Sequence, residues 1–196
     1  MSFINYASKE LHCKVIYYGA GLSGKTTNLQ YIYDHLGNDS RGKLMTLNQE
    51  NERTLFFDFL PLGVGEVRGY QTRFHLYTIP GQTFYEVSRD LILKGVDGLV
   101  FVVDSLEERM EANLESFEQL EKSLERQGYD IRKLPLVIQY NKRDIPGVVG
   151  TGELELTFNP HKRPAFEAIA SRGIGVMETL KEVCQKVISD LKGQNN

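Results

Sequence analysis

The sequence is poor in cysteine and contains no long apolar run, and both absences narrow the class of protein. Cys13 and Cys184 are the two cysteines among 196 residues, and they stand far apart. A disulfide framework of the kind that stabilises small secreted domains is therefore excluded, and a reducing cytoplasm is the expected compartment. No segment approaches the roughly 20 consecutive apolar residues that a transmembrane helix needs.

Targeting and lipidation signals are also missing from the two ends of the sequence. The N-terminal stretch MSFINYASKELH has no apolar core of the kind found in secretory signals. Ser2 stands where N-myristoylation needs a glycine, and the C-terminal LKGQNN has no prenylation cysteine. We therefore expect a cytoplasmic protein without a lipid anchor.

The sequence has no large excess of charge of either sign. It has 23 Lys and Arg against 26 Asp and Glu, a formal net charge of −3. Proteins that bind nucleic acid through bulk charge are strongly basic, so no nucleic-acid partner is expected. Hydrophobic residues make up 41% of the chain, an ordinary globular content, and we expect one domain over residues 1–196.

Apolar strand-like runs alternate with helical patterns along the chain. Strands are expected at residues 12–19, 54–62, 70–79, 95–104, 134–140 and 165–171. Helical spacing predicts helices at residues 25–35, 106–127 and 176–191. The second and third strands, joined through GVGEVRG, should form an antiparallel pair at a sheet edge. The alternation predicts an α/β fold with a mostly parallel, six-stranded sheet flanked by helices.

The most specific motif is G-x-x-x-x-G-K-[ST], which falls between the first strand and the first helix. Glycines there let several backbone N–H groups point at one anion, and the helix adds its positive dipole end. A lysine supplies charge for outer phosphates, and a threonine hydroxyl suits Mg²⁺. We predict a phosphate-binding loop formed by Gly19, Gly21, Leu22, Ser23, Gly24, Lys25, Thr26 and Thr27, with Thr26 as a metal ligand.

The second motif, NKRD, follows the buried strand LPLVIQY and indicates which base is bound. Guanine presents two adjacent donors, and the two acceptor oxygens of Asp144 match them, whereas adenine would face this carboxylate badly. Asn141 can bind the base edge and tie loops together, and the Lys142 stem can cover the flat face of the base. After the sixth strand, at Ala170 and Ser171, the Ala170 N–H could reach the guanine carbonyl.

Two further segments predict catalysis and switching. In IPGQ, Gly81 offers an N–H near a γ-phosphate and Gln82 can orient an attacking water. Thr54 can close over Mg²⁺ and the γ-phosphate as a second metal ligand. Its neighbour Arg53 is either a catalytic guanidinium acting in cis or a solvated arginine, and the residues leave both open. The two switch regions are expected at about residues 37–54 and 79–94.

With these motifs in place, the chain resembles the Ras-superfamily small GTPases along nearly its whole length. Within them it is most similar to the bacterial MglA-type GTPases. The stretches that carry the resemblance are GAGLSGKTTNLQYIY, ERTLFFDFLPL, TRFHLYTIPGQ, LILKGVDGLVFV, MEAN and IQYNKRD. The least typical part is residues 148–164.

The resemblance implies a P-loop NTPase with a Ras-like G domain that binds GTP and GDP with Mg²⁺ and hydrolyses GTP slowly by itself. It further implies control of cell polarity and of gliding or twitching motility through effectors that read the switch loops. A roadblock-type, MglB-like GTPase-activating protein is the implied partner, with recruitment to a cell pole. Because such a partner acts on switch geometry, the resemblance favours Arg53 as the arginine in cis.

One position departs from the usual GTPase pattern. The D-x-x-G segment is here Thr78-Ile79-Pro80-Gly81, so the aspartate that contacts Mg²⁺ through water is replaced by Thr78. The metal thereby loses an outer-shell negative charge. The resemblance also suggests that residues 54–60 shift between nucleotide states, a slide that the glycines of GVGEVRG would ease.

Two alternatives remain beside the switch. One is a nucleotide-locked scaffold that binds GTP with negligible hydrolysis. The other is a P-loop ATPase or nucleoside kinase, which the NKRD motif argues against. The N-terminal FINY is either an extra element or a contact surface.

Overall fold

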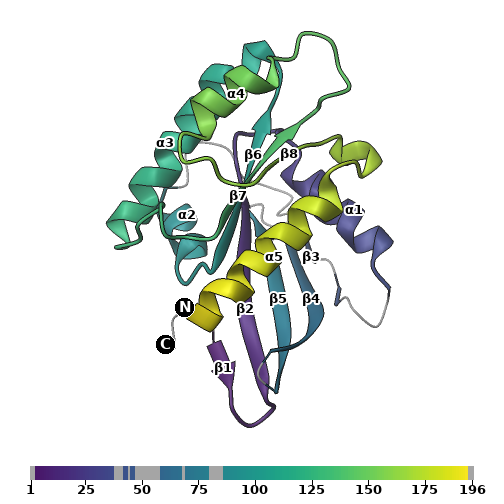
Figure 1. Ribbon diagram of the computed structural model, residues 1–196, viewed down its shortest axis with the longest axis vertical. Helices are drawn as coiled ribbons and strands as arrows, with labels where there is room; N and C mark the ends of the chain where they lie inside the picture. The colour runs from purple at the N-terminus through teal and green to yellow at the C-terminus, as the bar shows by residue number, and fades with distance from the viewer. Residues whose placement is uncertain are drawn as a thin grey trace, which may run out of the picture.

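A single mixed β-sheet organises the chain in the computed structural model (Figure 1). The structure describes residues 3–37, 42–43, 45–46, 58–67, 69–79 and 86–193. The strands are β1 (Phe3–Asn5), β2 (Glu10–Tyr18), β3 (Met45–Thr46), β4 (Asp58–Val67), β5 (Tyr70–Thr78), β6 (Gly98–Asp104), β7 (Leu136–Asn141) and β8 (Ala165–Glu167). The α-helices are α1 (Lys25–His35), α2 (Glu86–Leu93), α3 (Met110–Arg126), α4 (Thr151–Phe158) and α5 (Val176–Gly193), with short 3₁₀ turns η2 (Glu107–Arg109) and η3 (Ala170–Arg172).

The order of strands confirms the predicted six-stranded, mostly parallel sheet. Its path is β3-β4-β5-β2-β6-β7-β8, in which β5, β2, β6, β7 and β8 run parallel and β4 is antiparallel to β5. Two short antiparallel strands extend the predicted six: β3 pairs with β4, and β1 pairs with β2. The N-terminal FINY thus contributes an extra element.

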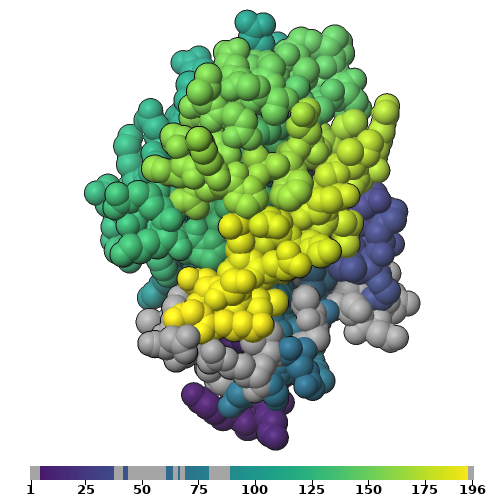
Figure 2. All heavy atoms as spheres, viewed as in Figure 1, coloured from purple at the N-terminus to yellow at the C-terminus, as the bar shows by residue number. Residues whose placement is uncertain are grey.

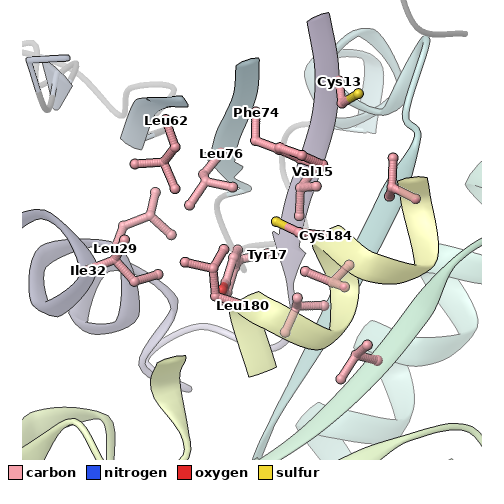
Figure 3. Packing of buried hydrophobic residues seen from close by; sticks show 14 of the residues in the cluster. Cys13, Val15, Tyr17, Leu29, Ile32, Leu62, Phe74, Leu76, Leu180 and Cys184 are labelled. Atoms are coloured by element: carbon pink, nitrogen blue, oxygen red, sulfur yellow. The ribbon is translucent and has the colours of Figure 1, made fainter. Parts of the chain in front are cut away.

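Helices cover both faces of the sheet, which explains why β6 and β7 are buried at every position. On one face, α1 and α5 pack on β2 and β5 through a cluster that includes Leu29, Leu180 and both cysteines (Figure 3). On the other face, α2, α3 and α4 pack on β6 and β7 through Leu93, Leu120 and others. Figure 2 shows α5, in yellow, as a continuous band on the surface of the first face.

The first helix has the predicted bounds, but the connection between β4 and β5 was predicted wrongly. Residues 63–67 of GVGEVRG belong to strand β4, and only residues 68–69 separate it from β5. The pairing register shifts between Gly63 and Glu66. A bulge accepts glycine inside a strand, so the glycines mark an irregular strand rather than a long loop.

Two helices were not expected from the sequence. Helix α4 occupies the middle of the atypical residues 148–164 and buries Leu154 and Phe158 against the sheet. Helix α2 lies inside the range expected for the second switch. Within the described part of the chain, no helix has the length and apolar character to cross a membrane.

Candidate nucleotide-binding site

The glycine-rich loop connects β2 to α1 at the carboxyl edge of the parallel strands, where such sheets bind ligands. Its two motif glycines are required by geometry. Gly19 has a φ of 144°, and a Cβ there would lie 2.2 Å from the carbonyl oxygen of Val102. Gly24 has a φ of 101°, and a Cβ there would lie 2.2 Å from Nδ2 of Asn141. The loop therefore runs too close to its neighbours to carry side chains at either position.

Side-chain cations hold the first three carbonyl groups of the loop. Lys25 is buried, and its Nζ donates to the carbonyl oxygens of Gly19 at 2.8 Å and Ala20 at 2.7 Å. Arg109 Nη2 donates to the carbonyl oxygen of Gly21 at 2.7 Å. Because these carbonyl oxygens point toward donors of the protein, they do not point toward an anion in the loop, which would repel them.

Asn141 joins the phosphate loop to the loop that follows β8. Its Nδ2 donates to the carbonyl oxygen of Ser23 at 2.8 Å, and its Oδ1 accepts the N–H of Ala170 at 2.9 Å. The side chain is buried, so both bonds are shielded from water. The Ala170 N–H is thus engaged by Asn141, and its bond to a guanine carbonyl stays a prediction, as does a role for Ser171 in η3.

The two charged residues of NKRD that were assigned to the base have partners within the protein. Lys142, with a φ of 66°, donates from Nζ to Oδ2 of Asp104 at 2.6 Å. Asp144 Oδ2 lies 3.7 Å from Nη2 of Arg172, and its side chain is 21% exposed. The Asp144 carboxylate lies on the loop after β7, on the same edge as the phosphate loop. Its pairing with guanine remains a prediction.

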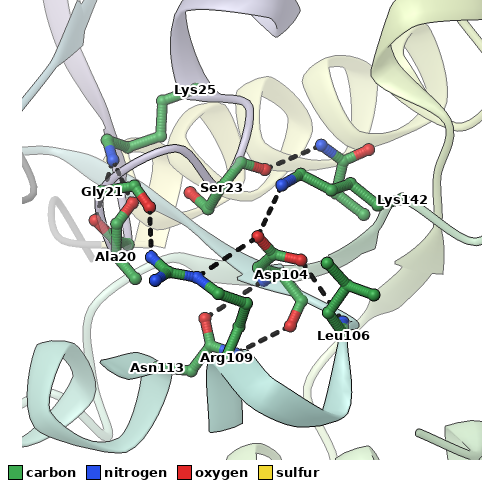
Figure 4. Close-up of polar contacts among 11 residues, drawn as sticks. Ala20, Gly21, Ser23, Lys25, Asp104, Leu106, Arg109, Asn113 and Lys142 are labelled. Carbon is green, nitrogen blue, oxygen red and sulfur yellow. Dashed lines mark hydrogen bonds and ion pairs between the residues drawn. The ribbon is translucent and has the colours of Figure 1, made fainter. Parts of the chain in front are cut away.

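Sequence reasoning missed a buried polar cluster beneath these loops (Figure 4). Asp104 ends β6 with no exposed side-chain area, and besides Lys142 it faces Arg109 Nε at 3.7 Å. Asn113 accepts the Asp104 N–H at 3.1 Å and donates to the Asp104 carbonyl oxygen at 2.8 Å. The aspartate that ends the apolar run GLVFVVD was the available signal, because the carboxyl ends of parallel strands converge at one edge.

The start of α1 fits a phosphate group. The cap residue Gly24 contributes no side-chain hydrogen bond, and the first turn holds no acidic residue, so its N–H groups and dipole can serve an anion. Ser23 Oγ is buried without a hydrogen-bond partner among the described residues. Thr26 and Thr27 are exposed on the first turn, where a hydroxyl could reach a cation held by phosphates.

Thr78, the residue that replaces the usual aspartate, ends β5 and is buried. It lies opposite Tyr17 in the parallel pairing, and the next N–H, of Ile79, donates to the Tyr17 carbonyl oxygen at 3.3 Å. Its position beside the end of β2 puts it next to the start of the phosphate loop. The predicted residues Arg53, Thr54, Gly81 and Gln82 lie outside the described residues.

A phosphate loop after the central strand, with an N-K-x-D loop two strands away, is the arrangement of a small GTPase. The chain belongs to the ADP-ribosylation factor family, whose sequence model matches residues 2–190.

Comparison with individual proteins confirms the resemblance to MglA-type GTPases. The chain is 59% identical over 192 residues to the mutual gliding-motility protein MglA of Myxococcus xanthus (strain DK1622), and the match covers 98% of each chain. It is 28% identical over 138 residues to ADP-ribosylation factor-like protein 6 of Caenorhabditis elegans, covering 68% of this chain and 70% of that one. The protein of the same name in Caenorhabditis briggsae is 25% identical over 177 residues, covering 85% and 90%.

Proposed function

We propose that this protein is a GTP-driven switch, one G domain over residues 1–196, that controls motility and cell polarity. The observation that carries the proposal is the double contact of Asn141, because it fastens a phosphate loop to a base-recognition loop. A ligand that has phosphates at one end and a guanine at the other would contact both loops at once. The binding of GTP or GDP would then stabilise the whole edge of the sheet.

The residues of the site divide the work of binding. Lys25, now on the carbonyls of Gly19 and Ala20, would also face the outer phosphates. Mg²⁺, held by Thr26 and Thr54, would neutralise phosphate charge. Because Thr78 brings no carboxylate, the phosphates would have to supply most of the negative charge that attracts this metal.

The residues of the switch regions perform the hydrolysis. Gln82 orients the attacking water, Gly81 donates its N–H to the γ-phosphate, and Arg53 neutralises charge on the departing group in cis. The two switch regions, residues 37–54 and 79–94, change conformation with the bound nucleotide. Effectors bind the conformation that they adopt with GTP. A roadblock-type, MglB-like protein accelerates the reaction by placing these segments.

The base assignment is tested by Asp144→Asn. The substitution turns one acceptor oxygen into a donor, so GTP affinity should fall by about tenfold to hundredfold. Affinity for xanthosine triphosphate should rise, because xanthine carries an oxygen where guanine carries the amine. Asp130→Asn, which changes a surface carboxylate paired with Arg132, is the matched control and should alter neither affinity. Unchanged GTP affinity in Asp144→Asn would remove Asp144 from base recognition.

Single-turnover hydrolysis of GTP separates the switch from a nucleotide-locked scaffold. The purified protein is loaded with GTP and Mg²⁺, and GDP is measured over time with and without a roadblock-type partner. Hydrolysis that is slow alone and faster with the partner is expected. If the protein retains GTP both with and without the partner, the nucleotide-locked scaffold is supported and the switch is refuted.

The motility role rests on the 59% identity to a protein named for mutual gliding motility. We propose that the chain acts at a cell pole, where its partners recruit it. Deletion of the gene in its own host should abolish directed surface movement, and the wild-type gene should restore it. A gene that encodes the Lys25→Ala variant, expressed to the same level, should not restore the movement. Normal movement of the deletion strain would refute the role.

A further inference from the structure

Arg109 belongs to none of the nucleotide-binding motifs, yet it contacts the phosphate loop directly. It sits in η2, just before α3, and is separated from Gly21 by 88 positions in the sequence. Its guanidinium uses two different nitrogens: Nη2 donates to the Gly21 carbonyl at 2.7 Å, and Nε faces Asp104 Oδ2 at 3.7 Å. One side chain therefore links a loop carbonyl to a buried carboxylate (Figure 4).

The bond to Gly21 fixes the direction of the next N–H. In a trans peptide, the C=O of one residue and the N–H of the following residue point in opposite directions. The peptides of the described residues are trans. Because the Gly21 carbonyl points toward Arg109, the Leu22 N–H points away from Arg109 and is left for a ligand of the loop.

Leu22 needs such an external restraint. Its φ of 66° is in the left-handed region, which a residue with a Cβ adopts at a cost. Its side chain is 86% exposed, so packing of the side chain does not hold this conformation in place. A turn bond from the Ser23 N–H to the Ala20 carbonyl oxygen, at 3.3 Å, closes the backbone around Leu22. The side-chain bonds from Arg109 to the Gly21 carbonyl and from Asn141 to the Ser23 carbonyl add the restraint on either side of this residue.

Arg109 is itself held by an anchor shared with the base loop. Asp104 is fully buried, binds Lys142 of the NKRD motif at 2.6 Å, and has its backbone fixed by Asn113. A buried carboxylate of this kind holds its cations tightly, because losing one leaves charge uncompensated in a low-dielectric site. The phosphate loop and the base loop are thus connected through Asp104 as well as through Asn141.

We propose that Arg109 is a positioning residue for the nucleotide, which keeps the Leu22 N–H aimed at the β-phosphate of bound GDP or GTP. The inference rests on the proposed function, because it assumes a nucleotide in this loop. Its specific consequence is that Arg109 acts on the diphosphate and not on the base or the α-phosphate. Removal of the guanidinium should therefore shorten the residence of GDP more than that of GMP.

The test compares Arg109→Met with Arg109→Lys and a control. Methionine keeps an apolar stem of similar length but donates no hydrogen bond, whereas lysine keeps one charged donor. Arg126→Met is the control, because Arg126 lies on α3 and pairs with Asp90 at 3.1 Å, outside the site. Release of fluorescent GDP is followed after excess unlabelled GDP is added, and affinities for GDP and GMP are measured by competition.

Arg109→Met should release GDP about tenfold faster than the wild type, because the Gly21 carbonyl loses a hydrogen bond from a charged donor. The GDP release rate of Arg109→Lys should lie between those of the wild type and Arg109→Met. The release rate of Arg126→Met should stay within about twofold of the wild-type rate. The ratio of GDP to GMP affinity should fall by about tenfold in Arg109→Met.

Three results would decide against the inference or its premise. Equal GDP release by Arg109→Met and Arg126→Met overturns the positioning role. Equal losses of GDP and GMP affinity show a general loosening of the fold, which also overturns it. If the wild-type protein binds no guanine nucleotide, the proposed function itself is refuted. This result differs from the first two because it is seen in the wild type, before any substitution is made.

Discussion

Substitution of Gly24 by alanine tests the geometry on which the nucleotide site depends. At this position alanine must adopt a φ of 101°, and its Cβ must lie 2.2 Å from Nδ2 of Asn141. Asn141 cannot keep that place, so its bond to the buried carbonyl of Ser23 breaks. The change therefore combines backbone strain with the loss of a buried contact.

The two costs can be estimated separately. A left-handed conformation costs a residue with a Cβ about 1–2 kcal/mol. The lost hydrogen bond and the unpaired buried carbonyl together add about 2–3 kcal/mol. Gly24→Ala should therefore lower the free energy of unfolding by about 3–5 kcal/mol, a large fraction of the stability of an ordinary domain.

Gly128 provides the matched control. It has a φ of 78°, and a Cβ there would meet no heavy atom of the described residues within 4 Å. Gly128→Ala should therefore cost only the backbone strain, about 1–2 kcal/mol. The difference between the two variants isolates the contact with Asn141.

Urea unfolding in the presence of EDTA, followed by circular dichroism, measures these free energies without bound nucleotide. In an Asn141→Ala background, Gly24→Ala should cost about 1–2 kcal/mol, like the control, because the atom that it strikes is gone. Equal costs for Gly24→Ala and Gly128→Ala in the wild-type background would refute the reasoning. So would an undiminished cost of Gly24→Ala in the double mutant.

Three further predictions concern catalysis, pH and the cysteines. Gln82→Leu should slow single-turnover GTP hydrolysis by at least about tenfold and leave GDP release unchanged, and a normal rate would remove Gln82 from catalysis. Burial, and then the charge of His12, lower the pKa of His75 below 6.5 in the folded protein. The unfolded chain therefore binds the proton more readily, and stability should fall as pH decreases below 6.5. His75→Gln should flatten this dependence in urea titrations between pH 7.5 and 5, and an unchanged slope would contradict it. Burial raises the pKa of both Cys13 and Cys184 to about 12. Iodoacetamide at pH 8 should therefore alkylate them only after unfolding, as mass spectrometry can check, and rapid labelling of the native protein would show that they are accessible.

The sequence predicted those parts of the protein whose information is local. The helix at residues 25–35 has the predicted bounds because a glycine-rich turn precedes it and Gly37 follows it. The largely apolar sequences of β6 and β7 indicated a sheet covered on both faces, and the alternation of elements indicated parallel pairing. The two nucleotide-binding motifs are likewise contiguous, so their residues could be named without coordinates.

Other features were predicted wrongly because the same local composition is compatible with more than one backbone conformation. The glycines of residues 63–69 suggested a loop, but backbone pairing with β5 holds most of the segment in β4 with an irregular register. Helix α4 was missed in the atypical segment, where the burial of Leu154 and Phe158 against the sheet stabilises it. In both cases tertiary contacts decided between conformations that the sequence alone left nearly equal.

The sequence by itself determined the α/β class and was sufficient to predict a phosphate loop and a base motif, because each depends on neighbouring residues and on repeating patterns of polarity. Only the tertiary structure showed that Arg109 and Asn113 gather around the buried Asp104 beneath these loops. Arg109 and Gly21 meet across 88 positions because parallel strands bring their carboxyl ends to one edge of the sheet. No local pattern encodes that meeting, since it arises from the order of the strands in space.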